Sequence, residues 1–335
     1  RLHNGIPMPL SDQSPLPQDF VELSARLGQD PLRVQGPGGN TSIKLGNILW
    51  IKASGTELAE ARNGSIFVAV DLAGARNEAR GAGDGTCMAC LVDKTQSLRP
   101  SIETTFHALI EWPVVAHIHS VVTITHGINP EGRAAAREKL AGLPVDFIPY
   151  RKPGRPLTER IATTLDRTTQ IWVLENHGLV CAGPDTTAVA SLVEEVERRL
   201  ELAPCATEMP DPAEPAPYGY NWLAASAGIA GDHRLCRLAL GGSYYPDHVV
   251  FLGPALPEWR DGLVAPAAVR SGRGLVVKET ATSAQRAMAR CLVDVLKRLP
   301  PDWTPQKLSP EQEGELLNWD AEKYRQALAA RRAEA

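Results

Sequence analysis

Apolar and polar residues along the first 200 positions follow two periods, one typical of strands and one typical of helices. Short apolar runs bounded by glycine or polar residues predict strands within residues 47–55 and 65–71. Residues 170–183 predict two further strands, interrupted at Asn176-His177-Gly178. Beyond them, apolar residues recur at helical spacing and predict a helix that buries one face, formed by Val189, Leu192, Val193, Val196 and Leu200. This alternation of strands and helices favours an α/β sandwich.

A proline-rich segment separates this pattern from a second, shorter one. Five prolines between Pro204 and Pro217 exclude a regular helix and a central strand. We therefore expect a first domain at residues 1–205, a linker at 206–217 and a smaller C-terminal α/β domain at 218–335.

The smaller domain has strand and helix signals of its own. The runs HVVFLG (248–253) and GLVVKE (274–279) predict strands, and residues 283–299 predict a helix. Near the end of the chain, Ser309 is a predicted N-cap, with Pro310 at the first helical position. One face of the long helix predicted there consists of Leu317, Ala321, Tyr324 and Leu328.

Composition narrows the class of protein. The chain has 335 residues, of which 43% are apolar and 22% charged, which is typical of a globular protein with a sizeable core. Its net charge of −4 favours neither nucleic acid nor an anionic membrane surface as a partner. No apolar run reaches the roughly 20 residues that span a bilayer. We therefore expect a cytoplasmic protein that acts on a small molecule.

Cysteine usage does not indicate a disulfide framework, because six cysteines are spread over a long chain. Cys87 and Cys90 form a single CxxC, which is found in zinc half-sites and in redox pairs. Since no second CxxC accompanies it, we interpret the two as reduced thiols in a loop.

Polar residues inside two apolar runs point to a metal site. In the run VVAHIHSVV, His117 and His119 lie two apart, so in a strand they face the same way about 7 Å apart. His177 interrupts another apolar run, and the glycine after it favours a tight turn. Three histidines with one open position are the general arrangement of a catalytic zinc site.

Three loops upstream add groups that suit a charged substrate. In RPSIETTFHALI, Ser101 is a helix-cap candidate, and Glu103 in the first turn is a candidate general acid/base. The loops GPGGNTSIK (36–44) and KASGTEL (52–58) combine glycines, hydroxyls, an amide and a lysine, which favours exposed N–H groups that hold an anion. Neither loop matches a P-loop or a dinucleotide fingerprint.

The order of these motifs is GGNTS, KASGTEL, PSIE with FHALI, HIH and NHGL, and it resembles the class II aldolase/adducin family. The resemblance covers roughly residues 20–203 and includes the zinc-dependent fuculose-phosphate and rhamnulose-phosphate aldolases. The runs SIETTFHALI, YPDHVVFLGP and LLNWDAEKYRQ are similar to one branch, the aldolase half of bifunctional rhamnulose-phosphate aldolase/lactaldehyde dehydrogenase proteins. No GxGxxG follows a predicted strand, so we expect no dehydrogenase half.

The resemblance implies a three-layer α/β/α sandwich and a set of site residues. The implied ligands of a zinc ion, or of another divalent cation such as Mn²⁺, are His117, His119 and His177. The implied catalytic residue is Glu103. The implied substrate- or phosphate-binding residues are Gly39, Asn40, Ser42, Ser54, Gly55 and Ser101, and we expect Lys52 to add a charge there.

The sequence departs from the family pattern at two places. Fuculose-phosphate aldolase has two consecutive serines before the glutamate, whereas Ile102 follows Ser101 here. The tyrosine that donates a proton in some members has no counterpart in EGRAAAREKL, and Tyr150 aligns elsewhere. The second proton donor is therefore left open, and so is the presence of a phosphate on the substrate.

The resemblance implies retro-aldol cleavage of a ketose, such as rhamnulose or fuculose 1-phosphate, through a metal-stabilised enediolate. A decarboxylase or epimerase acting on a sugar-acid phosphate is the alternative, and a non-catalytic adducin-like scaffold is a further one. The family also implies a homotetramer. We expect the C-terminal helix either to cover the mouth of the site or to form a subunit contact.

Overall fold

The computed structural model describes residues 15–63 and 65–334, and within them the first half of the chain forms one seven-stranded sheet. The strands are β1 (Asn40–Leu45), β2 (Ile48–Lys52), β3 (Phe67–Asp71), β4 (Val114–Ile118), β5 (Val145–Ile148), β6 (Ile171–Leu174) and β7 (Gly178–Gly183). Their spatial order is β3-β2-β1-β4-β7-β6-β5, and every neighbouring pair is antiparallel except β5 with β6.

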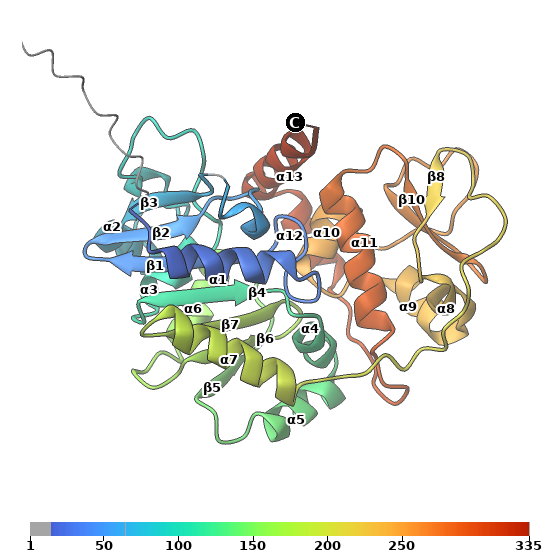
Figure 1. The fold of residues 1–335 in the computed structure, drawn as a ribbon, viewed down its shortest axis with the longest axis horizontal. Coiled ribbons are helices and arrows are strands. Elements are labelled where there is room, and N and C mark those ends of the chain that lie inside the picture. Colours follow the sequence, from blue (N-terminus) through green and yellow to red (C-terminus); the bar gives the residue numbers. More distant parts are fainter. Residues whose placement is uncertain (1–14, 64, 335) are drawn as a thin grey trace, which may run out of the picture.

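Helices cover both faces of this sheet (Figure 1). One face carries α1 (Gln18–Gln29), α5 (Pro130–Lys139) and α7 (Thr186–Arg199). The other carries α2 (Leu72–Ala79), α3 (Thr104–Leu109) and α6 (Arg155–Ala162). The short helix α4 (Val121–Gly127) follows β4, and the 3₁₀ turns η1 (Leu58–Glu60) and η2 (Met88–Cys90) lie in loops. The expected three-layer α/β/α sandwich is confirmed.

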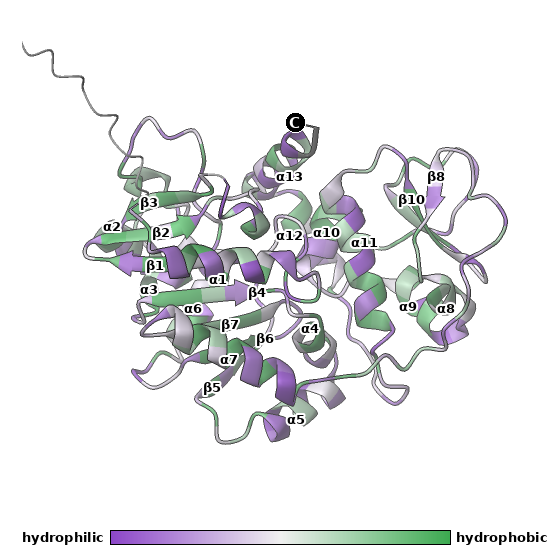
Figure 2. Ribbon diagram, in the orientation of Figure 1, coloured by the Kyte–Doolittle hydropathy of each residue, from purple (hydrophilic) through white to green (hydrophobic). Residues whose placement is uncertain are grey.

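Alternation along β4 decides which layer receives the histidines. Val114, Ala116 and Ile118 pack in the core under α1 and α7, whereas Val115 packs on the opposite face. Because successive side chains of a strand point to opposite faces, His117 shares the face of Val115 and lies under α3. The strands β2, β3 and β4 are apolar along most of their length (Figure 2).

The second half of the chain adds a three-stranded sheet and six helices within the described residues. The strands β8 (Tyr220–Trp222), β9 (Ala267–Arg270) and β10 (Gly274–Lys278) pair in the order β8-β10-β9. The helices are α8 (Ala227–Gly231), α9 (His233–Gly241), α10 (Pro246–Leu252), α11 (Ser283–Leu296), α12 (Pro310–Leu317) and α13 (Asp320–Glu334). The proline-rich segment 206–217 forms neither helix nor strand.

Two expectations for this half are wrong. Residues 248–253 do not form a strand, because Pro246 begins the helix α10 and all seven of its residues are buried. A short run that is apolar on every side does not distinguish a buried strand from a buried helix. The long C-terminal helix is also two helices, since α12 ends at Leu317 and α13 begins at Asp320.

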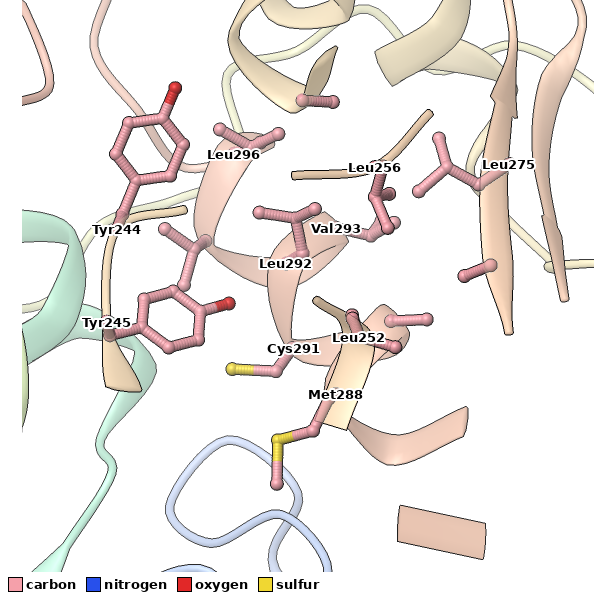
Figure 3. Packing of buried hydrophobic residues seen from close by; sticks show 14 of the residues in the cluster. Tyr244, Tyr245, Leu252, Leu256, Leu275, Met288, Cys291, Leu292, Val293 and Leu296 are labelled. Atoms are coloured by element: carbon pink, nitrogen blue, oxygen red, sulfur yellow. The ribbon is translucent and has the colours of Figure 1, made fainter. Parts of the chain in front are cut away.

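The core of the second half extends into the first half. Its buried cluster includes Val121, Ile124 and Ile128, which lie on or just after α4. Figure 3 shows α11 at the centre of this cluster, with Tyr244 and Tyr245 of the turn before α10 on one side and Leu256 and Leu275 on the other. The labelled residues are Tyr244, Tyr245, Leu252, Leu256, Leu275, Met288, Cys291, Leu292, Val293 and Leu296. The two halves are therefore packed through a shared apolar core.

The last helix returns to the first half of the chain. Arg325 of α13 donates to the carbonyl of Pro37, and Arg332 pairs with Glu60. No helix of the described residues is long and apolar enough to cross a membrane.

Candidate active site

Three histidines converge where β4 ends and β7 begins. The two strands are antiparallel neighbours, with Ile118 opposite Leu179, so the end of one lies beside the start of the other. His117 belongs to β4, His119 follows it, and His177 lies in the turn before β7. The imidazole nitrogens of the three lie within 4.8 Å of one another, and all three side chains are buried.

Glu103, at the start of α3, faces the histidines from the helical layer that covers this side of the sheet. It occupies the N-cap position of α3 without a side-chain capping bond, so it precedes the first turn in which the sequence placed it. Its Oε2 lies 3.2 Å from Nε2 of His117, and its Oε1 lies 3.3 Å from Nε2 of His177. The side chain is 4% exposed, so this carboxylate is withdrawn from water. The sequence places Glu103 near a metal by resemblance, and the fold brings it into contact with two of the histidines.

The donor set fits a divalent cation. Nδ1 of His117 donates to the carbonyl of Leu179 at 3.0 Å, and Nδ1 of His119 lies 3.2 Å from Oδ2 of Asp247. With the protons on Nδ1, the two Nε2 atoms carry lone pairs, yet they face each other at 3.2 Å. Two ligands about 2.0–2.1 Å from a tetrahedral zinc lie about 3.3 Å apart. A cation between these nitrogens resolves the repulsion of their lone pairs.

The charges of the buried groups suit the same ion. Burial lowers the pKa of His117 and lowers that of His177 to about 3, because the imidazolium form is poorly solvated there. Burial also opposes the charged form of Glu103, but attraction to the facing His117 and His177 rings when these are protonated, together with the hydrogen bond from the Asn40 amide, outweighs it and lowers its pKa to about 2. Metal ligation requires neutral imidazoles and ionised carboxylates, and the pKa shifts of His117, His177 and Glu103 favour these protonation states.

A hydrogen-bonded chain holds Glu103 in place. The Asn40 amide donates to Glu103 at 2.9 Å and to Ser101 Oγ at 3.1 Å. His107 Nε2 lies 2.5 Å from the Asn40 amide oxygen, and its Nδ1 lies 2.7 Å from Ser42 Oγ. Ser42 and His107 therefore fix the orientation of Asn40, and Ser42 does not reach the cavity next to the histidines.

A small cavity of about 20 Å³ adjoins the histidines and is lined from both halves of the chain. The first half contributes Gly39, Asn40, Lys52, Ser54, Gly55, Ser101, Ile102, Glu103, His119 and His177 among its lining residues. The second half contributes Asp247, Glu322 and Arg325. Except for Ser42, the substrate-binding residues implied by the sequence are thus brought together.

Two of the lining side chains have uncommon surroundings. Ser54 Oγ is buried and has no hydrogen-bond partner. Lys52 is 2% exposed and donates to the carbonyls of Pro37 and Thr56, and burial together with the nearby Arg325 lowers its pKa to about 7. The orphaned hydroxyl is therefore available to a ligand, whereas the lysine is largely committed to the backbone.

Sequence reasoning did not find the residues from the second half. Asp247 falls at the edge of the run that was read as a strand, and Glu322 and Arg325 lie on a helix whose charged residues look like an ordinary solvated face. The available signals were the i, i+3 spacing of Glu322 and Arg325 and the position of all three residues in the runs YPDHVVFLGP and LLNWDAEKYRQ, which resemble one branch of the family. Their contact with the site depends on how the two halves pack.

Comparisons with known proteins cover the first half of the chain. Residues 18–203 match the family described as Class II Aldolase and Adducin N-terminal domain. An L-fuculose phosphate aldolase from Methanocaldococcus jannaschii is 26% identical over 193 residues, which are 55% of this chain and 93% of that protein. An uncharacterized oxidoreductase, YuxG, from Bacillus subtilis is 28% identical over 201 residues, which are 54% of this chain. The match spans only 29% of that relative's length.

One solved structure is of the N-terminal class II aldolase domain of a conserved protein from Thermoplasma acidophilum. It is 22% identical, covers 60% of this chain and 98% of its own, and has a TM-score of 0.49. Each of these matches covers little more than half of the chain.

Proposed function

The chain belongs to the class II aldolase and adducin family, and we propose that it is a divalent-metal-dependent lyase that cleaves a ketose 1-phosphate by retro-aldol chemistry. The observation that supports this most is the convergence of three buried imidazoles and one buried carboxylate, Glu103, at a single point. A non-catalytic scaffold has no need of an ionised carboxylate withdrawn from water at that place.

The metal would be held by His117, His119 and His177, and zinc suits this nitrogen donor set. When bound, it supplies Lewis-acid stabilisation of the negative charge that develops on the ketose oxygens during cleavage. The rest of the chemistry belongs to the protein's own side chains.

Glu103 is the proposed general acid/base. Breaking the carbon–carbon bond turns the hydroxyl on one carbon into an aldehyde, so that hydroxyl loses a proton, and it leaves the bonding electrons on the other carbon, which must gain a proton. Glu103, a carboxylate before cleavage, would take up one proton and deliver it to that second carbon, and in the synthetic direction it would remove a proton from the same carbon. The Glu103 carboxylate faces the histidines and is held by the Asn40 amide, so its position is fixed before substrate arrives. A positioned acid/base of this kind contributes about 10²–10⁴-fold to the rate.

The far end of the substrate would bind to the loops that line the cavity. Gly39, Ser54, Gly55 and Ser101 present small side chains and backbone N–H groups, and the unpartnered Ser54 hydroxyl is available to an anionic oxygen. Holding that end orients the reacting bond toward the histidines and Glu103.

A substrate screen tests the proposal. Zinc- or manganese-loaded protein is incubated with ketose 1-phosphates, including those of rhamnulose and fuculose, and released aldehyde is measured with protein stripped by a chelator as the control. We expect metal-dependent aldehyde release from at least one of them. Release of carbon dioxide from a sugar-acid phosphate, without aldehyde from any ketose, would assign the chain to the decarboxylases of the superfamily instead.

A further inference from the structure

A line of polar contacts joins the last helix to one of the metal-binding histidines. Arg325 of α13 contacts Asp247 of α10, and Asp247 contacts Nδ1 of His119. All three residues are between 4% and 6% exposed. Asp247 and Arg325 lie outside residues 18–203, the part of the chain that matches the family.

The contact to His119 places a carboxylate beside one nitrogen of the ring. Nδ1 of the imidazole lies 3.2 Å from Oδ2 of Asp247, so the carboxylate favours a proton on Nδ1 and leaves Nε2, on the other side of the ring, as the lone-pair donor toward His117. A carboxylate in this position fixes the tautomer and the ring orientation of a metal-binding histidine and raises its basicity. Among the described residues, the group placed to hold a metal at this point is the three histidines, without Asp247.

Asp247 is itself held rigidly. The Arg325 guanidinium donates to both of its oxygens, at 2.5 and 2.9 Å, and makes further contacts to Glu322 at 3.3 Å and to the carbonyl of Pro37 at 3.2 Å. A two-point guanidinium–carboxylate contact sets direction as well as distance. The position of α13 is thereby coupled to the orientation of the His119 ring.

The glycine-rich loop is shaped to permit the contact. A Cβ at Gly38 would lie 2.9 Å from Oδ2 of Asp247 and 2.9 Å from Nδ1 of His119. Such distances do not occur for real Cβ atoms, so a side chain at Gly38 would force the carboxylate and the imidazole apart. Because Gly38 has no side chain, the glycine-rich loop of the first half leaves space for Asp247, from the second half, beside His119.

We propose that Asp247 and Arg325 are positioning residues of the metal centre, so that residues outside the family match complete the site by orienting His119. The proposal rests on the metal site of the proposed function, but not on the reaction that the site catalyses. It assigns the second half of the chain a role in metal affinity.

Zinc affinity tests the proposal directly. The dissociation constant is measured by competition with a chromogenic chelator for the full-length wild type, Asp247→Ala, Arg325→Gln and Gly38→Ala. Loss of an orienting partner of a ligand typically costs 10–100-fold in metal affinity, and we expect a loss in that range for each variant. Asp247→Asn, which keeps an oxygen acceptor, should recover part of it.

The matched control is Asp294→Asn. Asp294 is also a buried acid of the second half, 5% exposed and paired with Lys297 and Arg298, but it lies in α11 away from the histidines. Asp294→Asn should leave zinc affinity within about twofold of wild type. Circular dichroism of each metal-free variant identifies any variant that fails to fold.

A second readout separates positioning from general stability. In ¹⁵N-histidine NMR spectra of the metal-free protein, the His119 ring should be the Nδ1–H tautomer, and Asp247→Ala should lose that preference while remaining folded. If folded Asp247→Ala and Arg325→Gln bind zinc as tightly as wild type, the positioning role is wrong and the proposed reaction is untouched. If wild type binds zinc but releases no aldehyde, the proposed reaction fails and the positioning role stands.

Discussion

Two imidazole nitrogens that face each other at 3.2 Å in a buried site are the clearest residue-level feature that suits a bound cation. They belong to His117 and His119, and each ring has its other nitrogen engaged with a hydrogen-bond acceptor. Because a buried polar arrangement of this kind is costly unless it is compensated, the pair is best explained as half of a ligand set.

The first prediction concerns that pair. Purified wild-type protein should carry close to one divalent ion per chain, and the double variant His117→Ala/His119→Ala should lose most of it, because one imidazole and one carboxylate remain. Elemental analysis of desalted protein measures this, with His248→Ala as the control, since His248 is equally buried but lies outside the ligand group. Full retention of metal in the double variant would show that the site is elsewhere.

At this scale, the sequence revealed the residues whose type conflicts with their surroundings. Histidines inside apolar strands, and a glutamate at a helix start beside them, are conspicuous in a linear pattern. Asp247 and Arg325 are not, since an acid near a proline and a charged residue on a terminal helix have ordinary explanations. Their role depends on a contact between residues 78 positions apart.

At the scale of elements, the contact of α13 with the loop after β2 is the feature most open to test. Gly55 has a left-handed φ of +81°, and a Cβ there would lie 2.9 Å from Cβ of Leu328. The loop and the helix therefore approach so closely that only glycine satisfies both backbone and packing.

The second prediction follows from this contact. An alanine in the left-handed conformation costs about 1–2 kcal/mol. Gly55→Ala should lower the free energy of unfolding by more than this, because its Cβ also pushes against α13. Gly46→Ala is the matched control, since Gly46 has φ +60° but has nothing within 4 Å of its would-be Cβ. Denaturant unfolding measures both, and equal losses for the two variants would show that the α13 contact contributes nothing.

Elements were predicted well where periodicity and capping agreed. The helix α11 begins at a capping box formed by Thr282 and Gln285, and α12 begins at the expected cap, Ser309. Prediction failed at α10, where Pro246 starts a helix inside a run rich in valine, and at the break after Leu317. At α10 all seven residues are buried, so the apolar run has no polar face from which a helical period could be recognised.

At the scale of the whole molecule, the two halves share buried charge as well as an apolar core. Glu322 is 2% exposed, and burial raises its pKa to about 7 from an ordinary value of 4.5, although Arg325 acts in the opposite direction. Because the pKa of Glu322 is higher in the folded protein than in the unfolded chain, this carboxyl favours the folded state most at pH values below its unfolded pKa, where it is protonated and buries no charge. That contribution is lost as the pH rises from about 4.5 through about 7.

The third prediction is therefore a pH dependence of stability. Glu322→Gln carries no charge at any pH, so its melting temperature relative to wild type should rise between pH 5 and pH 8. Thermal unfolding across that range measures the difference, with Glu311→Gln, an exposed acid of α12, as the control. A Glu322→Gln difference that stays constant with pH would contradict the assignment.

The fourth prediction concerns assembly and rests on family resemblance. The resemblance implies a homotetramer, so we propose this assembly for the chain, with residues 1–205 as the catalytic domain and 218–335 as a smaller domain joined by the linker 206–217. Light scattering at micromolar concentration should give a mass near four times 36.2 kDa. A mass of one chain would argue against it.

The central claim is that Glu103 acts as an acid/base beside a bound metal, and one measurement tests it most directly. The rate of aldehyde release from a ketose 1-phosphate is measured side by side for zinc-loaded wild type and zinc-loaded Glu103→Gln. We predict a folded variant that keeps its metal and is slower by about 10²–10⁴-fold, because the histidines supply the coordination and the carboxylate supplies the proton transfer. Activity within a few-fold of wild type would contradict the account and reduce Glu103 to a charge at the start of a helix.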